Sequence, residues 1–222
     1  MPNDEAQSKP LAQEAAQLVP VRKRPKPGER RVQILQTLAS MLQQPGLERI
    51  TTAALASRLS VSEAALYRHF ASKAQMFEGL IDFIEQTVFT LVNQITKAEP
   101  GPLESGAEQG AYQAQRVVAM VIHFAEKNPG MARVMVGDAL VHENERLQQR
   151  MNQFFDKLEA SLRQCLRGPV MQANSATPTL DAQVKASALT AFLLGRLQRF
   201  ARSGYKRMPS EHLEASLALW LN

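Results

Sequence analysis

Cysteine is almost absent from this sequence: Cys165 is the only one among 222 residues. A disulfide within the chain and a zinc site built from cysteines are therefore excluded, and we expect Cys165 to pack as a small apolar side chain. No run approaches the roughly 18 consecutive apolar residues of a membrane span, and the N-terminus has no apolar segment of signal-peptide type. We therefore expect a cytoplasmic protein without a membrane span.

The residue patterns that carry catalysis are also missing. The sequence has no glycine-rich phosphate loop, no G-x-S-x-G motif and no isolated pair of acids. Its four histidines, at positions 69, 123, 142 and 212, are scattered. HENE at 142–145 has a spacing that can chelate a metal, but a solvated helix start explains it better. We expect neither an enzyme nor a bound metal or cofactor.

Positive charge, by contrast, is concentrated in one place. The formal net charge of the chain is +5. Residues 1–21 carry one basic and three acidic groups, residues 22–73 carry ten basic and three acidic groups, and residues 74–222 carry fifteen of each. The whole excess lies in the middle segment, which is typical of a polyanion-binding module joined to a neutral body.

The spacing of the apolar residues predicts an all-α chain of roughly nine helices, because no strand-type alternation stands out. Residues 1–27 mix Pro, Gln, Ala and charge, so we expect a disordered tail with a basic end. A first helix begins at Glu29 and is broken by Pro45 and the following glycine. A short second helix is capped by Thr51 or Thr52.

A tight turn and two further helices follow. Ser62 is well placed to cap a third helix that runs to Phe70, and Ser72 is well placed to cap a long fourth helix that ends before Pro100. Beyond it we expect helical segments at 103–127, 131–140, 143–167, 181–203 and 210–221. Gly168 and the proline after it are expected to open a polar loop that reaches residue 179.

The third helix has an unusual outer face. On a helical wheel Leu66 and Phe70 point toward the core, and the opposite side presents Ala64 and Arg68, with Ala65 and Tyr67 on its shoulders. Small residues at the crest let a helix enter the major groove of DNA closely, while basic and hydroxyl-bearing flanks meet phosphates. An ordinary surface helix with a mixed polar face is the alternative, which the preceding helix, the turn and the local charge disfavour.

The side chains of this segment suit specific contacts with a duplex. Alanine methyls can touch a thymine methyl, and Arg68 can reach either a base edge or a phosphate. Tyr67 and His69 suit phosphate oxygens. Lys73 stands at the start of the next helix, where the backbone N–H groups favour an anion.

Residues 50–77 resemble the helix-turn-helix of the TetR family, and they read ITTAALASRLSVSEAALYRHFASKAQMF. The most specific match is LYRHF at 66–70 with the Ser-Lys pair at 72–73. The resemblance implies a DNA-binding domain at 28–73, a larger helical domain for dimerisation and partner binding at 74–222, and a homodimer on a palindromic site, with room for more than one dimer per site.

The resemblance also implies roles by position. Phosphate contacts fall on Thr51, Thr52, Tyr67, His69 and Lys73. The groove-facing positions are Ser62, Ala64, Ala65 and Arg68. One departure is Ser60, where the family often has glycine in the turn, because a left-handed backbone costs serine more than glycine.

Further stretches are similar to the nucleoid occlusion factors of that family, and the similarity runs from about residue 30 to the end. They are SEAALYRHF with MFEGLIDFIE, FAEKNPGMARVMVGDAL, RLQQRMNQFFDKLEASLRQCLR and RFARSGYKRMP. This similarity implies a nucleoid-associated protein that, when bound to chromosomal sites, engages the tubulin-like GTPase FtsZ and blocks division over DNA. The implied FtsZ contact falls on Phe83 and on the corner at Lys127 and Asn128.

Several alternatives stay open at this point. Phe83 lies off the centre of its apolar stripe, so it is either exposed or packed under the DNA-binding domain. Gly195, within an apolar run, suits close helix approach at a dimer interface or ordinary packing within the chain. For the function, the alternative is a TetR-type transcriptional repressor released from its operator by a small hydrophobic effector.

Overall fold

The computed structural model describes residues 28–44, 50–97, 106–172 and 176–221. Within these ranges the chain forms nine α-helices, one short 3-10 helix and no β-strand. This confirms the predicted all-α class. None of the helices in these ranges is long and apolar enough to cross a membrane. The expected tail at 1–27 lies outside the described residues.

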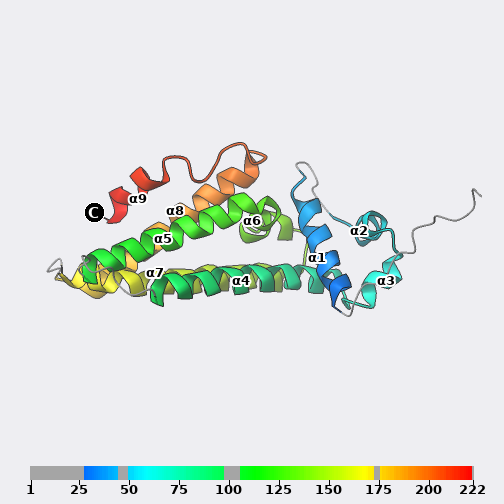
Figure 1. Cartoon of the computed structure of the whole chain (residues 1–222), viewed down its shortest axis with the longest axis horizontal. Helices are drawn as coiled ribbons and strands as arrows, with labels where there is room; N and C mark the ends of the chain where they lie inside the picture. Colours follow the sequence, from blue (N-terminus) through cyan, green and yellow to red (C-terminus); the bar gives the residue numbers. More distant parts are fainter. Residues whose placement is uncertain (1–27, 45–49, 98–105, 173–175, 222) are drawn as a thin grey trace, which may run out of the picture.

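Three short helices form one end of the molecule (Figure 1). They are α1 (Glu29–Leu42), α2 (Thr52–Leu59) and α3 (Glu63–Tyr67). The inner face of α1 buries Ile34 and Leu38, which are four residues apart and so lie on one side of the helix. This end packs onto the start of α4 (Lys73–Lys97) and onto α6 (Pro129–Met135).

The body of the molecule is a bundle of long helices. Its elements are α4, α5 (Gly106–Lys127), α7 (Glu145–Gln172) and α8 (Pro178–Arg202), with the 3-10 helix Asp138–Leu140 and the terminal α9 (Leu213–Leu221). In Figure 1, α4 and α7 run side by side along one edge, and α5 and α8 lie above them. Apolar residues from both ends of the chain join one continuous core.

The boundaries of several predicted elements are wrong. The segment expected at 131–140 is divided into α6, which ends at Met135, and a 3-10 helix, and the last helix, expected at 210–221, begins at Leu213. The third helix ends at Tyr67 and not at Phe70. Asn128-Pro129-Gly130 ends α5, but Pro129 is also the first residue of α6, where its missing N–H costs nothing. The helix predicted for 143–167 continues through Gly168 and Pro169 to Gln172. The loop predicted up to 179 is therefore shorter, and α8 begins at Pro178.

The contact between α1 and α6 joins the two halves of the molecule. Gly130 lies so close to α1 that a Cβ there would overlap the carbonyl oxygen of Ala39. The carbonyl of Leu42, at the end of α1, accepts hydrogen bonds from the Tyr205 hydroxyl at 3.0 Å and from Arg133 at 3.4 Å. The Tyr205 phenol is protonated at neutral pH without any shift, and burial raises its pKa further.

We expect Gly130→Ala to lower the free energy of unfolding by about 1–3 kcal/mol, because backbone atoms of α1 would have to move. Chemical denaturation measures this change. In the control, Gly79→Ala, the new methyl meets the end of the flexible Leu35 side chain at 3.0 Å. That side chain can rotate away, and alanine favours a helix, so we expect a change within about 1 kcal/mol. An equal loss in both variants would contradict the close α1–α6 contact.

Candidate nucleic-acid interface

The turn between α2 and α3 has the geometry that the sequence predicts. Thr51 caps α2, and its side chain accepts a hydrogen bond from the N–H of Ala54 at 3.1 Å. Ser60 ends α2 in the left-handed conformation, with φ 53° and ψ 48°. Ser62 then caps α3 by accepting from the N–H of Ala65 at 3.3 Å. These caps set the angle between the two helices within a few residues.

The two faces of α3 separate as expected. Leu66 and Phe70 are fully buried, at 0% and 1% exposure, which confirms their predicted inward orientation. On the outer face Ala64, Arg68 and His69 are exposed and Ala65 is half-buried. Tyr67 is 44% exposed. Because the helix ends at Tyr67, Arg68 and His69 lie in the turn that follows it.

The end of α3 is held by hydrogen bonds and by a cation. The N–H groups of His69 and Phe70 both donate to the carbonyl of Leu66. Arg31 of α1 places its guanidinium 4.1 Å from the centre of the Phe70 ring and donates to the carbonyl of His69 at 3.0 Å. Sequence reasoning missed Arg31, because nothing local shows that it reaches a turn 38 residues away.

The two threonines of α2 differ in what they can offer a phosphate. The Thr52 hydroxyl donates to the Glu63 carboxylate at 2.5 Å and so links α2 to α3. The exposed Thr51 accepts a bond as a cap and keeps its hydroxyl proton for another acceptor. Thr52 therefore connects the start of α2 to the start of α3, and Thr51 before it is the freer donor.

Lys73 has a partner that the sequence did not predict. It is the first residue of α4, next to Ser72, whose hydroxyl accepts from the N–H of Gln75 at 3.2 Å. Its ammonium group forms an ion pair with Glu143, which lies just before α7. The expected phosphate contact is thus occupied by an internal carboxylate in this structure.

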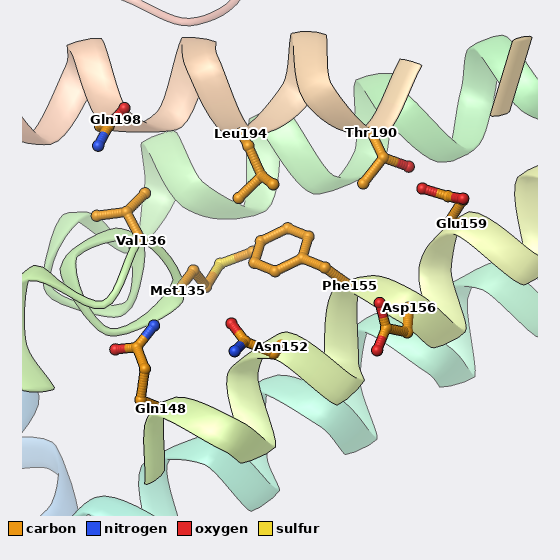
Figure 2. A pocket seen from close by; sticks show the side chains of 10 residues that line it. All are labelled: Met135, Val136, Gln148, Asn152, Phe155, Asp156, Glu159, Thr190, Leu194 and Gln198. Atoms are coloured by element: carbon orange, nitrogen blue, oxygen red, sulfur yellow. The ribbon is translucent and has the colours of Figure 1, made fainter. Parts of the chain in front are cut away.

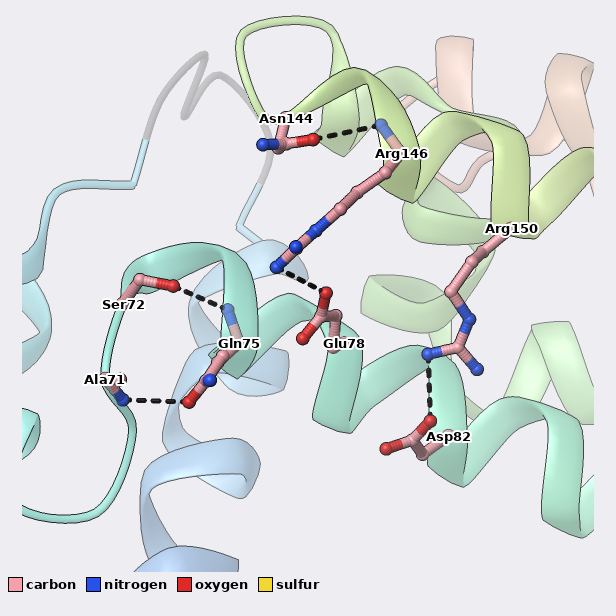
Figure 3. Close-up of polar contacts among 8 residues, drawn as sticks. All are labelled: Ala71, Ser72, Gln75, Glu78, Asp82, Asn144, Arg146 and Arg150. Carbon is pink, nitrogen blue, oxygen red and sulfur yellow. Dashed lines mark hydrogen bonds and ion pairs between the residues drawn. The ribbon is translucent and has the colours of Figure 1, made fainter.

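Further ion pairs extend along the seam between α4 and α7 (Figure 3). Arg146 contacts Glu78 at 2.6 Å, and Arg150 contacts Asp82 at 2.9 Å and Glu85 at 2.6 Å. Although partial burial opposes it, hydrogen bonds to these two acids raise the pKa of Arg150. The residue numbers rise together on both helices, so α4 and α7 run parallel.

A second surface gathers the residues implied in partner binding. Phe83 is 47% exposed, and its ring centre lies 6.4 Å from that of Phe124 on α5. The side chain of Asn128 donates to the carbonyl of Phe124 at 2.8 Å, and Lys127 beside it is exposed. Of the two readings left open for Phe83, the structure supports the exposed one. Phe124 was missed, because in the sequence it looks like any core residue.

Other candidate sites are weaker. The described residues contain no cluster of three or more metal-ligating side chains. A groove of about 590 Å³ lies between α7 and α8 (Figure 2). In Figure 2 the side chains of Phe155 and Leu194 point into the groove, and exposed polar residues such as Asn152 and Asp156 also line it. This mixed lining gives no specific support to a small hydrophobic effector.

Comparison with known proteins identifies the family. The model described as bacterial regulatory proteins, tetR family, matches residues 34–80, and the one described as Tetracyclin repressor-like, C-terminal domain, matches residues 109–222. The nucleoid occlusion factor SlmA of Idiomarina loihiensis is 45% identical over 186 residues, covering 84% of this chain and 90% of that protein. The chain belongs to the TetR family, among its SlmA nucleoid occlusion factors.

Other relatives agree with this assignment. The SlmA of Colwellia psychrerythraea is 45% identical over 181 residues, which are 82% of this chain and 87% of that protein. The SlmA of one Vibrio vulnificus strain is 45% identical over 195 residues, with coverage of 87% and 95%. These matches confirm the predicted family, and a DNA-binding nucleoid occlusion factor is the function they support.

Solved structures confirm the fold. PfmR of Thermus thermophilus, a TetR family transcriptional regulator, superposes with a TM-score of 0.63 at 20% identity, covering 85% of this chain and 96% of that one. The fatty acid degradation regulator FadR of Bacillus halodurans gives 0.68 at 14% identity, with coverage of 89% and 97%. At such identities the likeness shows the fold alone.

We expect Lys73→Gln to weaken binding to specific and random-sequence duplexes about equally, because a phosphate contact carries no sequence information. The slope of log affinity against log salt should shrink by about 0.9. Fluorescence anisotropy at several salt concentrations measures both quantities. The control is Lys97→Gln, at the other end of α4, roughly 36 Å away by helix rise. An unchanged slope in Lys73→Gln would contradict a phosphate contact.

Proposed function

We propose that this chain is a nucleoid-associated homodimer that binds a palindromic DNA site and, when bound, antagonises assembly of the FtsZ ring. It acts by contact alone and not as an enzyme. The observation that carries the proposal is the pairing of two surfaces on one helix. The start of α4 borders the DNA-facing turn, and Phe83 stands ten residues further along the same helix.

The DNA contact uses the outer face of α3 and the ends of its neighbours. The small exposed crest of α3 enters the major groove, and Arg68 follows it from the turn. The groove residues are Ser62, Ala64, Ala65 and Arg68, and the phosphate contacts are Thr51, Thr52, Tyr67, His69 and Lys73. The local charge of residues 22–73, ten basic against three acidic groups, attracts the duplex before any specific contact forms.

The dimer interface is proposed on α8. Its exposed side carries a stripe of apolar and small residues: Leu180, Val184, Ala191 and Gly195. A Cβ built at Gly195 would meet nothing within 4 Å in this chain. Since small residues let two helices approach closely, a second copy of α8 fits this stripe, and its two-fold symmetry matches a palindromic site.

We expect Ala191→Glu to shift the protein from dimer to monomer, because it places a charge in the middle of the stripe. Sedimentation equilibrium measures the dissociation constant of the dimer. It should rise at least about 100-fold, because the two copies would bury one glutamate each. Leu219→Glu is the control, since Leu219 is 86% exposed on α9 and is not part of the stripe on α8. A dimer of unchanged strength in Ala191→Glu would place the interface elsewhere.

The partner surface is proposed around Phe83, Phe124 and the corner at Lys127 and Asn128. An exposed aromatic ring against a second ring, beside a cation, is a typical anchor for a peptide with apolar and acidic side chains. Asn128 fixes the corner through its bond to Phe124. Lys127 supplies the charge that selects an acidic partner.

Sedimentation of FtsZ polymers tests this activity. The assay uses a duplex that the protein has itself selected from random-sequence DNA. With that duplex, the wild-type protein should reduce the pelleted polymer, and Phe83→Ala should lose this effect while it binds DNA normally. Tyr112→Ala is the matched control, because Tyr112 is 49% exposed on α5 and lies outside the Phe83 cluster. If DNA-loaded wild-type protein leaves the polymer unchanged, the proposed antagonism fails.

A further inference from the structure

We infer that Glu143 is an intramolecular competitor for DNA phosphate, which holds Lys73 on the C-terminal body until a duplex takes it over. The inference rests on the proposed phosphate contact of Lys73. It adds Glu143, which lies outside the helix-turn-helix, to the residues that control DNA binding. It also indicates how the body senses that DNA is bound.

The Lys73–Glu143 pair is more enclosed than the other pairs of this seam. The side chains of Lys73 and Glu143 are 20% and 10% exposed, whereas Arg146 is 55% exposed and Asp82 62%. The ammonium group also lies 5.6 Å from the centre of the Phe77 ring. Such a pair is screened less by salt than a surface pair. The Glu143 carboxylate can therefore compete with a DNA phosphate for the Lys73 ammonium group.

Glu143 is held in place by its own backbone. Its N–H donates to the carbonyl of Leu140 at 3.0 Å, and the next residue, Asn144, accepts from the N–H of Arg146 at 3.1 Å. The carboxylate is therefore presented to Lys73 from an ordered turn between the 3-10 helix and α7. The backbone at Glu143 is thus already ordered, and only its side-chain rotamers have to be fixed when the pair forms.

The polarity of the seam singles out this pair. In the other ion pairs between α4 and α7 within the described residues, α4 supplies the acid and α7 the arginine, as in Glu78–Arg146 and Asp82–Arg150 (Figure 3). At Lys73–Glu143 the signs are reversed. Among the α4 residues of these ion pairs, only Lys73 is a cation that a phosphate attracts. Lys73 lies at the end of α4 beside the DNA-facing turn.

Transfer of Lys73 to a phosphate leaves Glu143 without its cation and removes one tie between α4 and the segment before α7. The next ion pairs along these helices are Glu78–Arg146 and Asp82–Arg150, and Asp82 is the residue before Phe83. Consider a partner that binds more tightly once the Lys73–Glu143 pair is broken. Because coupling between two ligands is reciprocal, DNA raises the affinity for this partner and the partner raises the affinity for DNA by the same factor.

A double-mutant cycle tests the competition directly, with the full-length protein and a random-sequence duplex at low salt as the probe. Glu143→Gln should bind the duplex about threefold to tenfold more tightly, which corresponds to losing one partly buried pair. In the Lys73→Gln background the same change should have no effect. Glu143→Asp should restore weaker, wild-type-like binding, because it keeps the competing charge.

Glu145→Gln is the matched control, because it removes the same charge from an exposed residue two positions further on. It should change affinity less than about twofold, through screened long-range attraction only. A gain from Glu143→Gln that persists in the Lys73→Gln background would overturn the inference, as would weaker or unchanged binding.

Hydrogen exchange on the unmodified protein provides a measurement that needs no variant. Addition of the duplex should speed amide exchange in residues 141–146 while it slows exchange in residues 62–73. Unchanged or slower exchange in 141–146 would contradict release of Glu143. If the wild-type protein shows no salt-sensitive binding to the duplex at all, the proposed DNA contact fails first. If it binds but the cycle shows no coupling, only this inference fails.

Discussion

The DNA-facing end of the molecule depends on the burial of two side chains. Leu66 and Phe70 anchor α3 to the core, and each contributes about 1.5–3 kcal/mol by leaving water. Once they are buried, the helix has only one orientation, and its opposite face must point to solvent. Arg31 fixes the end of that helix by stacking on Phe70 and by bonding the turn after it. Arg31 from α1 thus stabilises the turn that carries Arg68.

The long helix α4 connects this end to the rest of the protein. It starts beside the DNA-facing turn and carries Phe83 in its middle, and its ion pairs with Arg146 and Arg150 keep it parallel to α7. A rigid helix transmits a change at one end to the other without a flexible joint. The exposed Phe83, whose ring packs beside the buried Phe124, is therefore well placed to respond to DNA.

Much of this architecture could be predicted from local patterns. Apolar spacing predicted α1 and α4, and the serines at 62 and 72 were correctly read as caps. The end of the third helix was misplaced, because Phe70 continues the apolar spacing although the backbone has already turned. Proline was read as a helix breaker at position 129, where it starts a helix. Contacts between distant residues left no local signal, so the Lys73–Glu143 pair was not foreseen.

The central claim is that the exposed, cationic face around α3 binds duplex phosphates. Its most direct test is the equilibrium affinity of the wild-type protein for a double-stranded oligonucleotide across a range of salt concentrations. We expect log affinity to fall linearly with log salt, with a slope of about −0.9 for each phosphate neutralised. Affinity that does not change with salt, or no attachment to any duplex at low salt, would contradict the claim.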